Sequence, residues 1–203
     1  MKVKNFILAS SSEVYQNPSI IPTPENIELK IPDINNPRYS YGGGKIFSEM
    51  MLFYYGKKFF KNSIIFRPHN VYGPNMGNEH VIPEFIKKIK NAQKKGNKTI
   101  SLEGKGSETR SFIYIDDFIE ALNILFKKGK DNNIYNIGTT EEVTILNLLQ
   151  LIQKKLNTNF KVKNIPIKKG GTNKRCPDIS KIKKLGFKKK YSLSAGLDHT
   201  IDW

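Results

Sequence analysis

Short apolar segments alternate with longer amphipathic segments along this chain, and that alternation constrains its fold more than any other feature. Residues 6–9 and 63–66 have the length and composition of buried strands. Over 39–57, apolar side chains such as Ile46 and Met50 recur at helical spacing. The whole pattern predicts strands at 4–9, 62–66, 99–102, 112–115 and 134–137, and helices at 39–57, 83–95, 116–126, 144–156, 178–185 and 194–203. Strands that alternate with helices indicate an α/β fold.

Size and cysteine content narrow the class of protein. The chain has 203 residues, of which 38% are hydrophobic, so it can bury the core of one domain or of one and a half. Its single cysteine, Cys176, excludes an internal disulfide framework and suits a reducing compartment such as the cytoplasm. No segment approaches the ~20 apolar residues of a membrane helix. The apolar run 6–9 is too short for a signal peptide.

The net charge of +16 fits three kinds of partner: nucleic acid, an anionic membrane surface or an anionic small molecule. The lysines are spread from Lys57 and Lys58 to the run 188–190, with no nucleic-acid-binding signature between them. We therefore interpret the charge as general lysine usage and expect neither a membrane partner nor a dedicated nucleic-acid surface.

Tyr41 and Lys45 form a Tyr-x-x-x-Lys motif within the predicted helix 39–57. A spacing of four puts both side chains on one helix face. An ammonium group beside a phenol favours the phenolate and lowers a pKa that starts near ~10. Such a phenol can exchange a proton with a substrate hydroxyl near neutral pH. The motif alone is a weak signal, because the same spacing is common on amphipathic helix surfaces.

Gly42, Gly43 and Gly44 lie between these two residues. Each glycine inside a helix costs ~1 kcal/mol relative to alanine. Three in succession therefore suggest that another segment approaches this turn closely. The alternative is a helix that begins only after Gly44.

Ser10, Ser11 and Ser12 follow the first predicted strand. Functional side chains gather at the carboxyl ends of strands in open α/β sheets. A serine hydroxyl can donate one hydrogen bond while it accepts another, and Glu13 adds a candidate acid or base. The alternative for the three serines is a solvated turn.

Five segments in order resemble one family over nearly the whole chain. The family is the extended short-chain dehydrogenase/reductases, the NAD-dependent epimerases and dehydratases that act on nucleotide sugars. The segments are ASSSEVY at 9–15, PRYSYGGGK at 37–45, FRPHNVYGP at 66–74, TRSFIYIDD at 109–117 and RCPDISK at 175–181.

The resemblance implies a role for each motif residue. Tyr41 would take the proton from the sugar 4-hydroxyl as hydride leaves for NAD, and Lys45 would hold the nicotinamide ribose. Ser11 would bind the same sugar oxygen, while Pro68 and His69 would lie on the cofactor side. The residues implied to bind the nucleotide sugar are Ser12, Asn70, Arg110 and Arg175. A guanidinium fork suits phosphate oxygens; the alternative for the arginines is a surface salt bridge.

Glu13 bears on the class of reaction. A glutamate at this point helps to move a second proton in the family's dehydratases and decarboxylases, whereas many simple 4-epimerases have no acid here. Ser12 stands where the dTDP-glucose dehydratases have aspartate, so that pair is incomplete. Epimerase, dehydratase and decarboxylase therefore stay open.

The family begins with a strand, a glycine-rich turn and a helix that hold the dinucleotide pyrophosphate, and this sequence contains no such unit. The resemblance therefore predicts the C-terminal part of a Rossmann-type parallel sheet plus a small substrate-binding α/β subdomain. Residues 1–78 would be the remainder of the NAD-binding domain, and 79–203 mainly the substrate-binding part, interleaved with late Rossmann elements.

We expect an incomplete chain with weak NAD affinity, whose activity by itself is open. The full-length family form would be a homodimer. The competing hypothesis is a catalytically inactive, basic binding fragment that acts through a partner chain or nucleic acid. His69, His80 and His199 lack metal-ligand spacing, so no metal site is predicted, although His69 is a candidate for lining the pocket.

Overall fold

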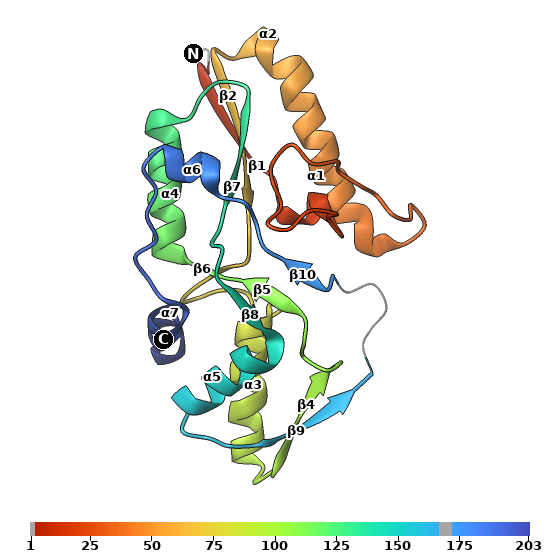
Figure 1. The fold of residues 1–203 in the computed structure, drawn as a ribbon, viewed down its shortest axis with the longest axis vertical. Coiled ribbons are helices and arrows are strands. Elements are labelled where there is room, and N and C mark those ends of the chain that lie inside the picture. The colour runs from red at the N-terminus through yellow and green to blue at the C-terminus, as the bar shows by residue number, and fades with distance from the viewer. Residues whose placement is uncertain (1–2, 167–171) are drawn as a thin grey trace.

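The computed structural model describes residues 3–166 and 172–203. Its upper half in Figure 1 contains a parallel sheet of β1 (Asn5–Ala9), β2 (Asn62–Pro68) and β7 (Asn133–Ile137), in the order β1-β2-β7. Phe6 lies opposite Ser63, and Phe66 lies opposite Tyr135. The predicted pairing of 6–9 with 63–66 is confirmed, and β1 forms one edge of this sheet.

Helices lie on both sides of this sheet (Figure 1). On one side, α1 (Ser40–Met51) continues through a π-helical turn, Leu52–Gly56, into α2 (Lys57–Phe59). On the other side lie α4 (Ile115–Lys128) and α6 (Ser180–Lys184). Leu125 of α4 and Ile182 of α6 are buried in one cluster with Ile64 and Ile137 of the sheet. A parallel sheet between helices is the predicted α/β arrangement.

A second group of elements forms the lower half of Figure 1. It contains α3 (Val81–Lys94), α5 (Ile145–Lys155) and the parallel pair β4 (Thr99–Glu103) and β9 (Lys161–Ile165). Ile89 of α3, Leu149 of α5 and Leu102 of β4 share one buried cluster. The apolar pattern does not predict β9, because four of its five residues are exposed and backbone pairing with β4 holds it.

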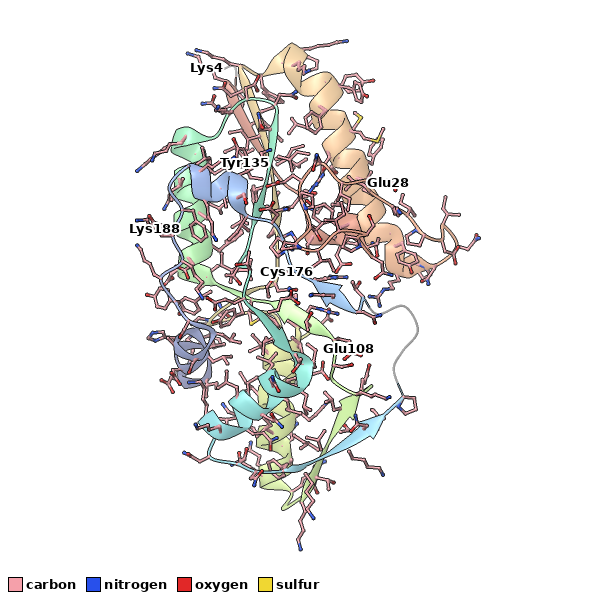
Figure 2. All side chains as sticks on the ribbon, viewed as in Figure 1. Lys4, Glu28, Glu108, Tyr135, Cys176 and Lys188 are labelled. Atoms are coloured by element: carbon pink, nitrogen blue, oxygen red, sulfur yellow. The ribbon has the colours of Figure 1, made fainter. Side chains whose placement is uncertain are left out.

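Short strands lie at the junction of the two halves. β5 (Thr109–Ser111) pairs with both β8 (Glu142–Thr144) and β10 (Lys174–Arg175), while β3 (Val71–Tyr72) pairs with β6 (Ile113–Tyr114). α7 (Leu193–Asp202) packs here, with Gly196 against Tyr72 and Tyr114. Cys176 is buried where the halves meet (Figure 2).

The chain crosses this junction repeatedly. β7, α4 and α6 come from 79–203 but belong with the sheet of the upper half. The division of function between 1–78 and 79–203 stays a prediction. Lysines project from several sides of the molecule, for example Lys4 and Lys188 in Figure 2. Among the described residues, no helix combines the length and apolar character needed to cross a membrane.

The three glycines lie inside α1, which begins at Ser40, so the alternative of a helix that begins after Gly44 is wrong. A Cβ added at Gly42 would lie 2.8 Å from Gln16 Nε2 and 3.0 Å from the Glu13 carbonyl oxygen. A Cβ at Gly44 would meet nothing within 4 Å. The expected close approach therefore explains Gly42, and it does not explain Gly44.

This difference makes a paired prediction. Gly42→Ala should lower the free energy of unfolding by about 1 kcal/mol or more, because the new methyl group overlaps the backbone of Glu13. Gly44→Ala should raise it by about 0.5–1 kcal/mol, because alanine fits open space and restricts the unfolded chain. Urea unfolding followed by circular dichroism measures both. Equal losses in the two variants would contradict the packing role of Gly42.

Candidate active site

Helix α1 is fixed against the end of β1 at the position of the Tyr-x-x-x-Lys motif. Lys45 Nζ donates a hydrogen bond of 2.9 Å to the carbonyl oxygen of Ala9, the last residue of β1. The same ammonium lies 5.6 Å from the ring centroid of Tyr41. Tyr41 is 56% exposed, so its phenol is accessible from solvent. The predicted motif therefore stands beside the serine run, with an accessible phenol.

The three serines are buried, so the alternative of a solvated turn is wrong. Ser11 is the N-cap of a short 3₁₀-helix, Ser12–Tyr15, and its Oγ accepts a hydrogen bond of 3.1 Å from the Glu13 amide. This bond uses the acceptor side of the Ser11 hydroxyl and leaves its proton free to donate. We refer to residues 10–15 as the serine turn.

A buried ion pair lies behind the serine turn. Arg67, at the end of β2, donates from Nε to Glu49 Oε1 at 2.9 Å and from Nη2 to Glu49 Oε2 at 2.5 Å. Glu49 lies one helical turn after Lys45 on α1 and also accepts a hydrogen bond from the Ser10 hydroxyl. Arg67 and Glu49 are 1% and 3% exposed. This pair was not predicted from the sequence, although a charged residue near the end of a buried strand needs a buried partner.

The ion pair continues into a chain of polar groups. Arg67 Nη1 donates to the Tyr15 hydroxyl at 2.7 Å, and that hydroxyl donates to Asn136 Oδ1 at 2.7 Å. Burial raises the pKa of Tyr15 to about 12, so the hydroxyl keeps the proton that it donates. Asn136 Oδ1 also lies 3.2 Å from His69 Nε2.

His69 and Pro68 lie at the end of β2, where Pro68 is its last residue. The His69 ring is 2% exposed, and burial lowers its pKa to about 3. Its Nδ1 has no hydrogen-bond partner among the residues that the structure describes. Contact of His69 and Pro68 with a cofactor stays a prediction.

Glu13 and Arg175, predicted as an acid and as a substrate ligand, bind each other. Arg175 donates from Nη1 to Glu13 Oε1 and from Nη2 to Glu13 Oε2, the second bond being 3.0 Å long. Arg175 Nη2 also donates to Thr172 Oγ1 at 3.0 Å. Through this pair, β10, which contains Arg175, lies against the serine turn.

Arg110 lies next to this pair and has a different environment. Its guanidinium donates to the carbonyl oxygens of Thr109 and Thr172 at 2.7 Å each, and no carboxylate of the described residues forms an ion pair with it. Burial, followed by the charge of Arg175, lowers the pKa of Arg110 to about 10. Within the described residues, Arg110 is therefore a partly desolvated cation that forms no ion pair, which favours the binding of an anion.

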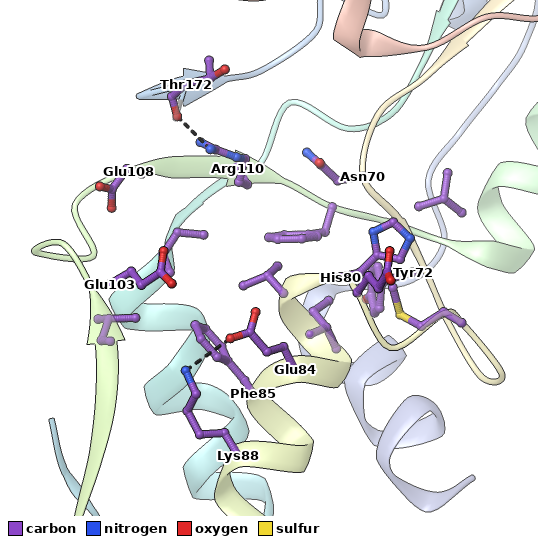
Figure 3. Close-up of a pocket in the computed structure, with 18 of the residues that line it drawn as sticks. Asn70, Tyr72, His80, Glu84, Phe85, Lys88, Glu103, Glu108, Arg110 and Thr172 are labelled. Carbon is purple, nitrogen blue, oxygen red and sulfur yellow. Dashed lines mark hydrogen bonds and ion pairs between the residues drawn. The ribbon is translucent and has the colours of Figure 1, made fainter. Parts of the chain in front are cut away.

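A cleft of about 440 Å³ opens below Arg110 (Figure 3). Arg110 and Asn70 lie at one end of it, and Phe85 and Lys88 of α3 lie at the other. Asn70 has a positive φ of 39° and donates from Nδ2 to the Ser111 carbonyl oxygen at 2.9 Å. Tyr41, Lys45 and the serine turn do not line this cleft. Thr172 connects the two regions, because it binds Arg110 and Arg175.

Comparison with known proteins identifies the family of this chain. The family model for the NAD dependent epimerase/dehydratase family matches residues 1–138, so the chain belongs to that family. Members of this family use NAD as cofactor. The resemblance that the five motifs carry is thereby confirmed, as is the Rossmann-type fold.

Three similar proteins illustrate the range of the family. The chain is 35% identical over 74% of its length to a dTDP-D-glucose 4,6-dehydratase of Dictyostelium discoideum, and 32% identical over 94% to UDP-glucuronic acid decarboxylase 3 of Arabidopsis thaliana. It superposes over its whole length, with a TM-score of 0.86 and 27% identity, on a UDP-glucuronic acid 4-epimerase from Bacillus cereus in complex with UDP-glucuronic acid and NAD. The chain spans 35%, 55% and 62% of the lengths of these proteins.

The burial of His69 makes a prediction about pH. The native pKa is about 3 and the unfolded value is near ~6.5, so between these values the unfolded state binds one more proton. Stability should therefore fall as the pH is lowered below ~6.5, with a contribution of up to ~1.4 kcal/mol per pH unit from this group. His69→Gln should reduce that slope.

The control for this experiment is His80→Gln, which replaces an exposed histidine. It should keep the slope of the unmodified chain. Urea unfolding at several pH values between about 4 and about 7 measures the slopes. The same slope in His69→Gln and in the unmodified chain would contradict the burial of a neutral His69.

Proposed function

We propose that this chain takes part in the NAD-dependent oxidation of a nucleoside-diphosphate sugar at its C4 hydroxyl. The observation that carries the proposal is the accessible Tyr41 phenol beside Lys45, on a helix fixed at the serine turn. Arg175 binds Glu13 of the same turn, and Arg110 shares Thr172 with Arg175. Epimerisation, dehydration or decarboxylation would follow the oxidation.

The residues around the motif fit a bound NAD. An ammonium group has three donors, and Lys45 uses one of them on Ala9, which leaves two for the hydroxyls of the nicotinamide ribose. Tyr41, Pro68 and His69 would complete the contact with the nicotinamide end. When bound there, NAD supplies a hydride acceptor.

Tyr41 and Ser11 would act on the sugar hydroxyl. Tyr41 would be the base that takes the hydroxyl proton, with the Lys45 ammonium 5.6 Å from the centroid of its ring. The free proton of the Ser11 hydroxyl donates to the same sugar oxygen and holds it near Tyr41. Glu13, held by Arg175, is the carboxylate available at the serine turn for a second proton transfer, and Ser12 contacts the sugar.

The diphosphate would bind at Arg110 and at Arg175 Nε, which the pair with Glu13 leaves without a partner among the described residues, with Asn70 placing the nucleotide sugar at the mouth of the cleft. Arg110 supports this assignment because its guanidinium bonds only neutral carbonyl oxygens in the described structure. A phosphate would supply the missing negative charge. A nucleic-acid partner gains no comparable support, since it needs a basic face and not one partly desolvated arginine.

Exposed apolar side chains on α1 and the π-helical turn support a homodimer as the form that acts. Phe47, Met50 and Tyr54 are 63%, 53% and 72% exposed. A second copy of the chain would cover them. Tyr54→Lys should then shift the chain towards monomer in sedimentation velocity. A monomer at every concentration before substitution would contradict the dimer.

Arg110→Met should weaken the binding of a nucleoside diphosphate by about tenfold or more, because a charge-assisted hydrogen bond to phosphate is lost. Titration calorimetry with UDP, GDP, CDP and dTDP measures the affinity and identifies the base. Lys155→Met removes a positive charge outside the cleft, where Lys155 pairs with Asp198, and serves as the matched control. No heat from any of the four nucleotides would contradict the proposed anion site.

Tyr41→Phe should lower turnover by about 10²-fold or more and leave nucleotide affinity unchanged, because only the proton transfer is removed. The assay supplies NAD at millimolar concentration, since weak NAD affinity is expected, and follows 4-keto sugar formation from UDP-glucose, UDP-glucuronic acid and dTDP-glucose. Undiminished turnover in Tyr41→Phe would rule out its role as the base.

A further inference from the structure

The buried pair Arg67–Glu49 contacts both ends of the serine turn. Glu49 accepts a hydrogen bond from the hydroxyl of Ser10, at the start of the turn. Arg67 donates to the hydroxyl of Tyr15, at its end, and its guanidinium carbon lies 4.8 Å from the centroid of the Tyr15 ring. One ion pair thereby holds the segment that contains Ser11 and Glu13.

Glu49 of this pair belongs to α1, the helix that carries Tyr41. Along α1, Glu49 contacts Ser10, Lys45 contacts Ala9, and Gly42 lies against the backbone of Glu13. The helix and the segment 9–16 therefore run side by side, with contacts at three successive levels. At the contact of Glu49, β2 also contributes a buried side chain, Arg67.

We propose that Glu49 and Arg67 are positioning residues, which set the serine turn against α1 so that Ser11 and Tyr41 meet one substrate oxygen. The inference rests on the proposed function, since the distance between Ser11 and Tyr41 matters only if both residues act on the same hydroxyl. Neither residue reaches solvent or the cleft, so each acts through others: Glu49 through Ser10, and Arg67 through Tyr15.

A role in stability alone predicts a different outcome from a role in positioning. A buried ion pair can often be replaced by apolar residues of similar volume without loss of stability. The double variant Glu49→Met with Arg67→Met should therefore melt closer to the unmodified chain than either single variant does. It offers no partner to the Ser10 hydroxyl and none to the Tyr15 hydroxyl, so it should not restore the turn.

The test measures hydrogen exchange at the backbone amide of Glu13, which donates to Ser11 Oγ in the serine turn. In the double variant this amide should exchange about tenfold faster, because the turn opens locally without its anchors. Amides of β4 should keep their exchange rates. The control Glu120→Gln removes an exposed ion pair with Lys190, and it should change neither the exchange rate of the Glu13 amide nor those of the β4 amides.

Ser10→Ala provides a second variant that keeps the ion pair and removes only its bond to the turn. It decides the question if the double variant does not fold, and faster exchange at Glu13 with unchanged β4 amides is again the expected result. An unchanged exchange rate at Glu13 in a folded variant overturns the inference. Because the measurement needs no substrate, that result is distinct from failure of the proposed function, which would appear as undiminished turnover in Tyr41→Phe.

Discussion

The buried ion pair between Arg67 and Glu49 is the interaction on which the arrangement of the site depends. Removing either charge leaves the other desolvated and unpaired, which costs several kcal/mol, roughly 3–5 for a buried pair. The buried Arg67 side chain donates four hydrogen bonds: two to Glu49, one to the Tyr15 hydroxyl and one to the carbonyl oxygen of Glu25. These bonds offset the desolvation of its charge. Strand β2, helix α1, the serine turn and the following loop are therefore joined at a single guanidinium.

The parts of the fold that follow from local pattern were predictable from the sequence. The strands at 62–66 and 134–137 and the helix at 83–95 agree with β2, β7 and α3 because their apolar periodicity directly reflects which face is buried. Strand β9 has no such pattern, since four of its five residues are exposed, with Val162 packed against the core while the backbone pairs with β4. The motif residues were also predictable, because each segment carries its own short signature.

The partners of those residues were not predictable from the sequence. Glu13 and Arg175 are separated by 162 positions, and their pairing depends on how the chain returns to the serine turn. Glu49 lacks any signature of its own, yet it contacts both Ser10 and Arg67. Sequence identifies side chains that carry chemistry, whereas tertiary structure decides which of them share a hydrogen bond.

Asn136 adds a constraint on the order in which the molecule can assemble. The Asn136 side chain bonds to the Tyr15 hydroxyl and to the Thr23 carbonyl oxygen, and the Asn136 backbone amide donates to the Glu25 carboxylate. These partners lie 121, 113 and 111 positions earlier in the chain. Contacts of such long range close large loops, which costs chain entropy and slows folding. During synthesis, Tyr15 is therefore made long before Asn136, whose side chain accepts its hydrogen bond. The serine turn cannot form this bond until residue 136 has been synthesised.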